Sequence, residues 1–375
     1  MEPRSNDNCD DSSLNVPTAI NIFYDTILNN LDTYGQNLTV IKEALADDWN
    51  MRPNPLNLFN ANIIKKLKIT LGLNLSPNSP KGIESGPFPE GIKTIWDFVA
   101  IMLPNLKYER RHTFVINENI VAVVTRLEAT IGDVPPSFSE FSMFPGIDPI
   151  KLKGKLFTTM ALDVHILDKG KIRKTWHVTD WTLALDQMLK TGRDVGTLDW
   201  PCVKQGETLK EVPQCIYNLY DKILSDSNGG GQNNTLLLET MHRDSIVRPR
   251  QSILGVEGIA GLKAITTFFG RVMPDIKYET QRMWIHEDKV IVLSKVSATN
   301  VKGAPPGFRF IPSFPGVNPK KLIGKKFETL GISVHRIVDG RIKQTYHIDE
   351  WQLAVDQMLS NRPAPDFDFY SDMNF

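Results

Sequence analysis

The sequence predicts an α+β fold that is built twice in tandem, with N-terminal helices packed on a curved antiparallel sheet in each copy. Two observations lead to this prediction. The chain of 375 residues contains a long internal repeat, and within each repeat an apolar period of three to four residues gives way to a period of two. The length also suits two domains of ordinary size.

The repeat is clearest towards the end of each copy. Residues 144–189 align with residues 314–359 without a gap, and 23 of the 46 aligned positions are identical. The offset is 170 residues there and 196 nearer the N-terminus, because the first copy carries an insertion of 26 residues. The repeat therefore divides the chain into copy 1 at residues 14–192 with its insertion at 54–86, a linker at 193–209, and copy 2 at 210–361.

Each copy is predicted to begin with two amphipathic helices. Apolar residues recur at helical spacing over residues 20–31 and 216–224, and again over residues 92–103 and 262–273. A proline directly after each second helix ends it. The tail from Pro363 is expected to be loosely held, although its aromatic residues could dock on a surface.

Antiparallel hairpins are predicted to follow, because apolar and polar residues alternate in the next segments. A first hairpin is expected over residues 108–127 in copy 1 and 277–296 in copy 2. A second hairpin and a short helix then complete each copy, and the helices cover residues 181–189 and 351–359.

The second hairpin of copy 2 turns at residues 338–340, and copy 1 has the same turn 170 residues earlier. A three-residue loop there places His335 opposite Lys343 and on the same face as Thr345 and His347. A two-residue loop would instead place the two histidines on opposite faces of the sheet. We expect the arrangement in which the histidines share a face.

Composition narrows the functional classes. The 43 Lys and Arg residues balance 43 Asp and Glu residues, which argues against nucleic acid or a membrane surface as the partner. There is no signal-peptide pattern and no apolar run of about 20 residues. Three cysteines without a Cys-x-x-Cys pair argue against a disulfide framework and a structural zinc site. We expect a soluble, cytoplasmic protein without a metal.

The order of motifs resembles the SnoaL-like polyketide cyclases of the nuclear transport factor two-like superfamily. Both copies carry Pro-x-Leu/Ile-Lys-Tyr-Glu before the first hairpin and His-x-x-Asp/Glu-Trp at the end of the second. The resemblance implies two cone-shaped α+β barrels, each with one deep pocket and no cofactor. It also implies that the two copies pair through their sheets as an intramolecular pseudo-dimer, which would leave the chain monomeric.

The resemblance further implies a set of site residues. Asp180 in copy 1 and Glu350 in copy 2 match the acid/base carboxylate of the family, and Arg52 and Arg248 match its pocket-mouth loop, where each could hold an anionic or carbonyl oxygen. A carboxylate in an apolar pocket beside an imidazole can remove a C–H proton and stabilise the resulting enolate. The candidate histidine partners are His165, His177, His335 and His347.

Structural roles compete with these assignments. Asp349 and Gln352 have the spacing of a helix capping box, which would put Glu350 in the first turn of the last helix, where negative charge is favourable. Copy 1 has Thr179 and Asp180 in the same places. The repeated histidines could equally be structural, and the two arginines could be exposed loop residues.

Two functions remain open from the sequence. The first is cofactor-independent cyclisation, isomerisation or dehydration of a small hydrophobic carbonyl or polyketide-like compound. The alternative is a non-catalytic module of the same fold that binds a small molecule or a protein. A cavity of about 300 Å³ with two or three converging polar groups would favour catalysis. A cavity filled by Trp176, Phe268 or Trp284 would favour the module.

Overall fold

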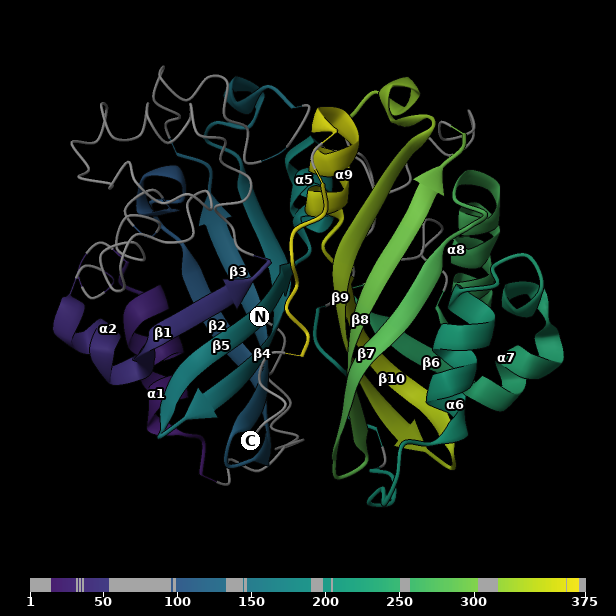
Figure 1. Ribbon diagram of the computed structural model, residues 1–375, viewed down its shortest axis with the longest axis horizontal. Coiled ribbons are helices and arrows are strands. Elements are labelled where there is room, and N and C mark those ends of the chain that lie inside the picture. The colour runs from purple at the N-terminus through teal and green to yellow at the C-terminus, as the bar shows by residue number, and fades with distance from the viewer. Residues whose placement is uncertain are drawn as a thin grey trace, which may run out of the picture.

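The computed structural model confirms the α+β fold with two tandem units (Figure 1). One five-stranded sheet is formed by strands of copy 1 and the other by strands of copy 2, and helices pack on both. The predicted insertion at residues 54–86 lies outside the described residues. The structure describes residues 15–31, 33, 35, 37–53, 96, 99–132, 144, 147–189, 198–203, 205–249, 257–302, 316–361 and 363–370.

The elements of copy 1 follow the predicted order of helices, hairpins and a last helix. Its helices are α1 (Thr18–Asn21), the π-helix η1 (Ile22–Leu28), α2 (Leu38–Ala44), the 3₁₀ helix η5 (Pro149–Lys151) and α5 (Trp181–Leu189). Its strands are β1 (Leu45–Arg52), β2 (Lys107–Asn117), β3 (Ile120–Thr130), β4 (Leu156–Asp168) and β5 (Lys171–Thr179).

Copy 2 repeats this order. Its helices are α6 (Gln214–Tyr217), the π-helix η6 (Asn218–Leu224), η7 (Gly230–Gln232), α7 (Asn234–Thr240), α8 (Gly258–Val272), η9 (Pro319–Leu322) and α9 (Trp351–Ser360). Its strands are β6 (Met241–Arg248), β7 (Lys277–His286), β8 (Lys289–Asn300), β9 (Lys325–Val338) and β10 (Arg341–Asp349).

The sheets are mixed rather than purely antiparallel, which corrects the prediction. Their strand orders are β1-β5-β4-β3-β2 and β6-β10-β9-β8-β7, and the first strand of each copy pairs in parallel with the last. This first strand was missed because it lies at a sheet edge. Its residues are mostly half-buried or exposed, so they do not show the alternation that marks a strand with one buried face.

The two histidines of the second hairpin share a face as expected, but the loop is shorter than predicted and a bulge compensates for it. Its loop contains only Asp339 and Gly340, both at positive φ (48° and 70°), as a tight two-residue turn requires. A bulge at Lys343 then shifts the register by one residue, so His335 pairs with Thr345 and not with Lys343. The bulge returns the two histidines of each copy to one face, and copy 1 shows the same register shift.

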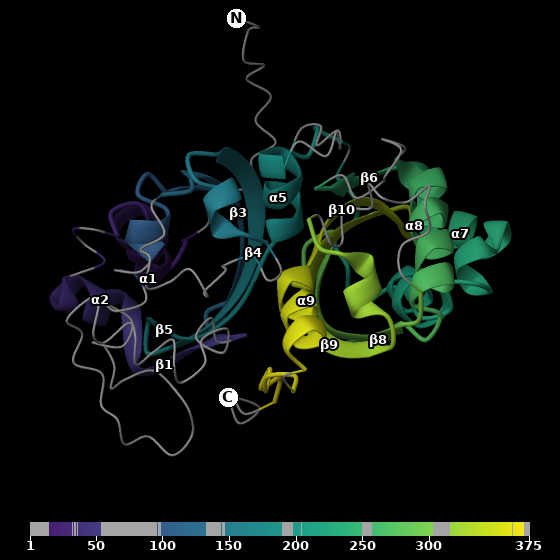
Figure 2. The ribbon, with the colours of Figure 1, turned by 90° about the horizontal axis from the view of Figure 1, so that it is seen from above.

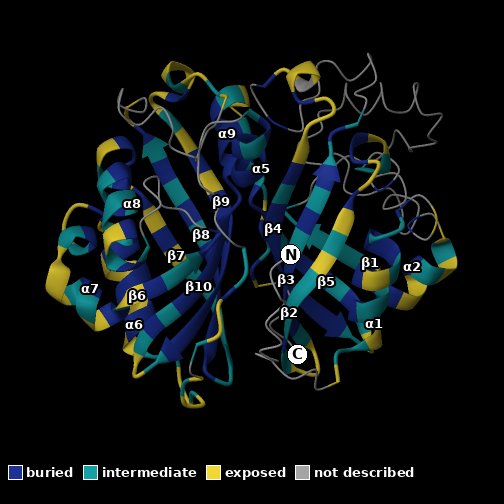
Figure 3. Ribbon diagram, turned by 180° about the vertical axis from the view of Figure 1, so that it is seen from behind, coloured by how far each residue is buried: buried dark blue, intermediate teal, exposed yellow. Residues whose placement is uncertain are grey.

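Three apolar clusters stabilise the molecule. Two lie between the concave face of each sheet and the helices of the same copy. The third joins the outer faces of the two sheets, with Val164 and Trp176 from copy 1 and Ile332 and Tyr346 from copy 2. From above, α5 and α9 lie side by side between the sheets (Figure 2), and the facing strands are largely buried (Figure 3).

A short segment after each copy packs on the other copy. In the linker strap, residues 198–203, Trp200 stacks on Tyr346 of copy 2 with ring centroids 4.1 Å apart. In the tail strap, residues 363–370, the carbonyl of Phe367 accepts a 3.0 Å hydrogen bond from Trp176 Nε1 of copy 1. Phe367 is buried, so this part of the tail is docked and not loosely held.

The cysteines and the helices bear on the cellular compartment of the protein. Cys202 in the linker strap takes part in a disulfide bond, whereas Cys215 is a buried free thiol. Disulfide bonds are more typical of oxidising compartments than of the cytoplasm, so the cytoplasmic location remains a prediction. Among the described helices, none combines the length and apolar character needed to cross a membrane.

Candidate functional site

A pocket lies on the concave side of the copy 2 sheet, between the sheet and helix α8. Its free volume is about 60 Å³, which leaves room for only a few water molecules. Its walls are mainly apolar, with Met241, Leu262, Ile265 and Phe269 among the lining residues. The polar residues that line it are Glu257, Tyr278, His335, Thr345 and His347.

His335 is held as a neutral imidazole at the wall of this pocket. Its Nε2 lies 3.0 Å from the hydroxyl of Tyr220, and its Nδ1 lies 2.9 Å from Oγ1 of Thr345. Burial, with a smaller contribution from the neighbouring His347, lowers the pKa of His335 to about 3. His335 therefore carries no charge at neutral pH, and both of its nitrogen atoms are engaged.

The pKa of His347 is shifted in the opposite direction to that of His335. Its Nδ1 lies 2.7 Å from Oγ of Ser333, and its Nε2 lies 3.1 Å from Oδ2 of Asp349. Burial acts to lower the pKa of His347, but the Asp349 carboxylate, with a smaller contribution from Asp180 of copy 1, outweighs burial and the pKa is raised. Tyr278 donates a 2.8 Å hydrogen bond to the same carboxylate oxygen. The result is a buried, hydrogen-bonded His347–Asp349 ion pair beside the pocket.

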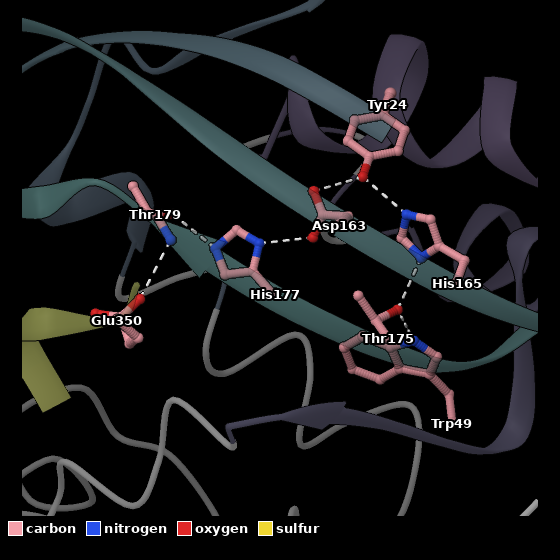
Figure 4. Close-up of polar contacts among 8 residues, drawn as sticks. All are labelled: Tyr24, Trp49, Asp163, His165, Thr175, His177, Thr179 and Glu350. Atoms are coloured by element: carbon pink, nitrogen blue, oxygen red, sulfur yellow. Dashed lines mark hydrogen bonds and ion pairs between the residues drawn. The ribbon is translucent and has the colours of Figure 1, made fainter. Parts of the chain in front are cut away.

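Copy 1 contains a corresponding network (Figure 4). Tyr24 donates a 2.7 Å hydrogen bond to Oδ2 of Asp163 and lies 2.8 Å from Nε2 of His165. The other oxygen of Asp163 lies 2.7 Å from Nδ1 of His177. Burial lowers the pKa of His165 to about 4, whereas Asp163 outweighs burial and raises the pKa of His177. In both copies, therefore, the pKa of the first histidine is lowered and that of the second is raised.

The two copies place the carboxylate on opposite sides of the equivalent histidine. In copy 1, Asp163 lies at Nδ1 of His177, and the hydroxyl of Thr179 lies 2.8 Å from Nε2. Copy 2 has Ser333 and Asp349 at those two places. The sequence analysis overlooked Asp163 and assigned Asp349 to a helix capping box, which is wrong because the Asp349 carboxylate bonds Tyr278 and His347. The available signal was strand alternation, which puts a residue two positions from a histidine on the same face.

A glycine makes room for the carboxylate of copy 2. A Cβ atom at Gly331 would lie 2.4 Å from Oδ1 of Asp349 and 2.7 Å from Oγ of Ser294. Copy 1 has Ala161 at the position of Gly331, and there the smaller Thr179 replaces the aspartate. The missing methyl group therefore explains why Asp349 fits in copy 2.

The two carboxylates predicted from the resemblance lie elsewhere. Asp180 directly precedes α5, and its Oδ1 accepts hydrogen bonds from the Leu183 amide (2.9 Å) and the Thr182 hydroxyl (2.5 Å), which is the capping role. Glu350 is not among the residues that line the copy 2 pocket. Its Oε2 accepts a 3.2 Å hydrogen bond from the amide of Thr179 in copy 1.

The predicted arginines also lie outside the pocket lining. The buried Arg248 forms a 2.5 Å ion pair with Glu257, which does line the pocket. Arg52 is the last residue of β1. Each arginine precedes a cis proline.

The aromatic residues expected to fill a cavity do not line the described pocket. Trp176 and Trp284 pack in the cluster between the two sheets, and Phe268 is buried in the copy 2 core while its neighbour Phe269 lines the pocket. In the part of the chain that the structure describes, no group of three or more His, Cys, Asp or Glu residues is placed to bind a metal ion.

Comparison with known proteins identifies similar folds only. No protein-family model and no curated protein matches the sequence. Among solved structures, TsrD from Streptomyces laurentii is 15% identical, covers 39% of this chain and 92% of its own, and has a TM-score of 0.31. IdmH from Streptomyces antibioticus is 18% identical, covers 38% and 95%, and scores 0.28.

A SnoaL-like polyketide cyclase from Agrobacterium tumefaciens is 12% identical, covers 38% of this chain and 94% of its own, and scores 0.29. SnoaL-like polyketide cyclases are thus among the solved structures that this chain is similar to. Identities and scores this low carry no argument about activity.

Proposed function

We propose that copy 2 binds a small, mostly apolar carbonyl compound and catalyses cofactor-independent proton transfer, of the kind that cyclisation, isomerisation or dehydration requires. The observation that carries the proposal is the buried His347–Asp349 pair at the wall of an otherwise mainly apolar pocket. His347 lines the pocket and Asp349 lies behind it, and an imidazolium next to a carboxylate can supply an acid and a base for the two halves of an enolisation.

The hydrogen bonds of the pocket histidines indicate where a ligand would bind. Both nitrogen atoms of each pocket histidine are hydrogen-bonded within the protein, so a ligand oxygen must replace one of these contacts. The 3.1 Å contact between His347 Nε2 and Asp349 is the longest of the four. A carbonyl oxygen that takes this proton leaves the carboxylate, still bonded to Tyr278, to accept the C–H proton; because Asp349 does not line the pocket, the substrate must reach it past His347.

A non-catalytic binding module is the second candidate, and the size of the pocket favours it. The free volume of about 60 Å³ is well below the roughly 300 Å³ of ordinary ligand pockets. A substrate would have to displace the apolar side chains of α8 or β6 that line the pocket. Catalysis thus requires an opening motion, whereas a module that recognises its partner elsewhere does not.

An NMR experiment separates the candidates. The probe is an alkyl-substituted β-keto ester, whose α-hydrogen exchanges with deuterium through the enolate. We expect the protein to accelerate exchange, and His347→Gln and Asp349→Asn to reduce this acceleration by about 100-fold or more. His242→Gln is the matched control, because His242 bonds the Val338 carbonyl outside the pocket. Shifts of pocket signals without faster exchange would favour the binding module. If the probe caused neither signal shifts nor faster exchange, the proposal would be refuted.

The state of assembly is part of the same proposal. Because the outer faces of the two sheets cover each other within one chain, we propose that the chain is a monomer with an internal pseudo-dimer. Light scattering is expected to give the mass of one chain, 42.3 kDa. A stable mass of two chains would contradict this.

A further inference from the structure

Glu350 reaches from copy 2 into copy 1. It precedes α9 at the position where a side chain usually accepts hydrogen bonds from the first amides of its own helix, yet the N-cap of α9 has no such side-chain bond. The carboxylate instead accepts the 3.2 Å hydrogen bond from the amide of Thr179 (Figure 4). The equivalent Asp180, one methylene shorter, stays on its own helix.

Thr179 connects this carboxylate to the histidine network of copy 1. Its hydroxyl lies 2.8 Å from Nε2 of His177, whose Nδ1 lies 2.7 Å from Asp163. Glu350 is buried between the copies, so its contact with Thr179 is shielded from solvent. We propose that Glu350 is a positioning residue for copy 1, which fixes the end of β5 and supplies a second negative charge to His177 from the other copy.

The electrostatics agree with this geometry. Burial raises the pKa of Glu350 to about 7, although the Thr179 amide, His177 and, to a smaller extent, the Leu353 amide of α9 act in the opposite direction. The carboxylate in turn helps to raise the pKa of His177, after the larger effect of Asp163. Asp180, which precedes α5, is the other charged neighbour of Glu350 and raises its pKa. The charge on the copy 1 histidine therefore depends on a residue of copy 2.

The test is an NMR titration of His177 in the full chain without any ligand, with its signal assigned from its absence in His177→Gln. Glu350→Gln keeps an oxygen that can accept from the Thr179 amide but removes the charge. We expect the midpoint of His177 to fall by about 0.5 to 1 pH unit, with little change in melting temperature. Glu328→Gln, an exposed acid on β9, is the matched control and should leave the midpoint unchanged.

A second variant covers the case in which Glu350→Gln does not fold. Glu350→Asp keeps the charge but shortens the side chain to that of Asp180, so its carboxylate should return to its own helix and the His177 midpoint should again fall. An unchanged His177 midpoint in the folded Gln variant, or in the Asp variant if only that one folds, overturns the proposal. Because no ligand is used, this result is independent of the proposed activity of copy 2.

Discussion

The neutral histidines of the two copies should make the fold sensitive to acid. Burial lowers the pKa of His165 to about 4 and that of His335 to about 3, compared with roughly 6.5 in an unfolded chain. The unfolded state therefore binds more protons than the folded state below pH 6.5, and stability falls as the pH decreases. With up to 1.36 kcal/mol per pH unit, acidification from pH 7 to pH 5 costs about 2 kcal/mol for each histidine.

The substitution His335→Gln isolates one of these contributions. We expect it to destabilise the protein at pH 7, and we expect its deficit in the free energy of unfolding, measured with urea, to be smaller by about 2 kcal/mol at pH 5. The raised pKa values of His177 and His347 act in the opposite sense, but both proteins share them. Leu237→Ala removes only buried apolar contacts and should show the same deficit at both pH values. An equally constant deficit for His335→Gln would refute the reasoning.

Two further predictions concern packing. Gly331→Ala places a methyl group 2.4 Å from Asp349 Oδ1, so it should destabilise the protein by about 1–3 kcal/mol in urea unfolding. Adding both Ser333→Asp and Asp349→Thr, which completes the copy 1 combination of Ala161, Asp163 and Thr179, should recover most of this loss. Phe367→Ala removes a buried anchor of the tail strap and should cost about 3 kcal/mol in the same assay, whereas substitution of the exposed Tyr370 by Ala should cost less than 1 kcal/mol. Equal losses for these last two variants would contradict a docked strap.

The sequence was most informative where the repeat and apolar periodicity agreed. The first helices follow residues 20–31 and 216–224 closely, because a helix on the concave face of a sheet buries one stripe of side chains. The two hairpins of each copy were also found, although β4 and β9 are buried on both faces along most of their length. Identical histidines in both copies pointed correctly to the polar inner face of the second hairpin.

The remaining features depend on contacts between distant segments. The parallel strand β1 pairs with β5 more than 100 residues later, and its edge position leaves no periodic signal. The bulge at Lys343 has no glycine to mark it. Trp176 packs on the outer face of its sheet, and Glu350 of copy 2 contacts Thr179 of copy 1. Both features follow from the packing of the two sheets, which the local sequence pattern does not encode.

The aspartate of the histidine network lies at a different position in each copy, Asp163 in copy 1 and Asp349 in copy 2. This difference indicates what the site requires. Burial without a hydrogen-bonded carboxylate lowers the pKa of an imidazole, as it does for His335. Each copy has a single aspartate bonded to its second histidine, but on opposite ring nitrogens. The common feature is therefore one aspartate hydrogen-bonded to the second histidine of each copy, and the position of this acid is free to change when a neighbour such as Gly331 makes room. This accounts for an acid two residues from a histidine in each copy.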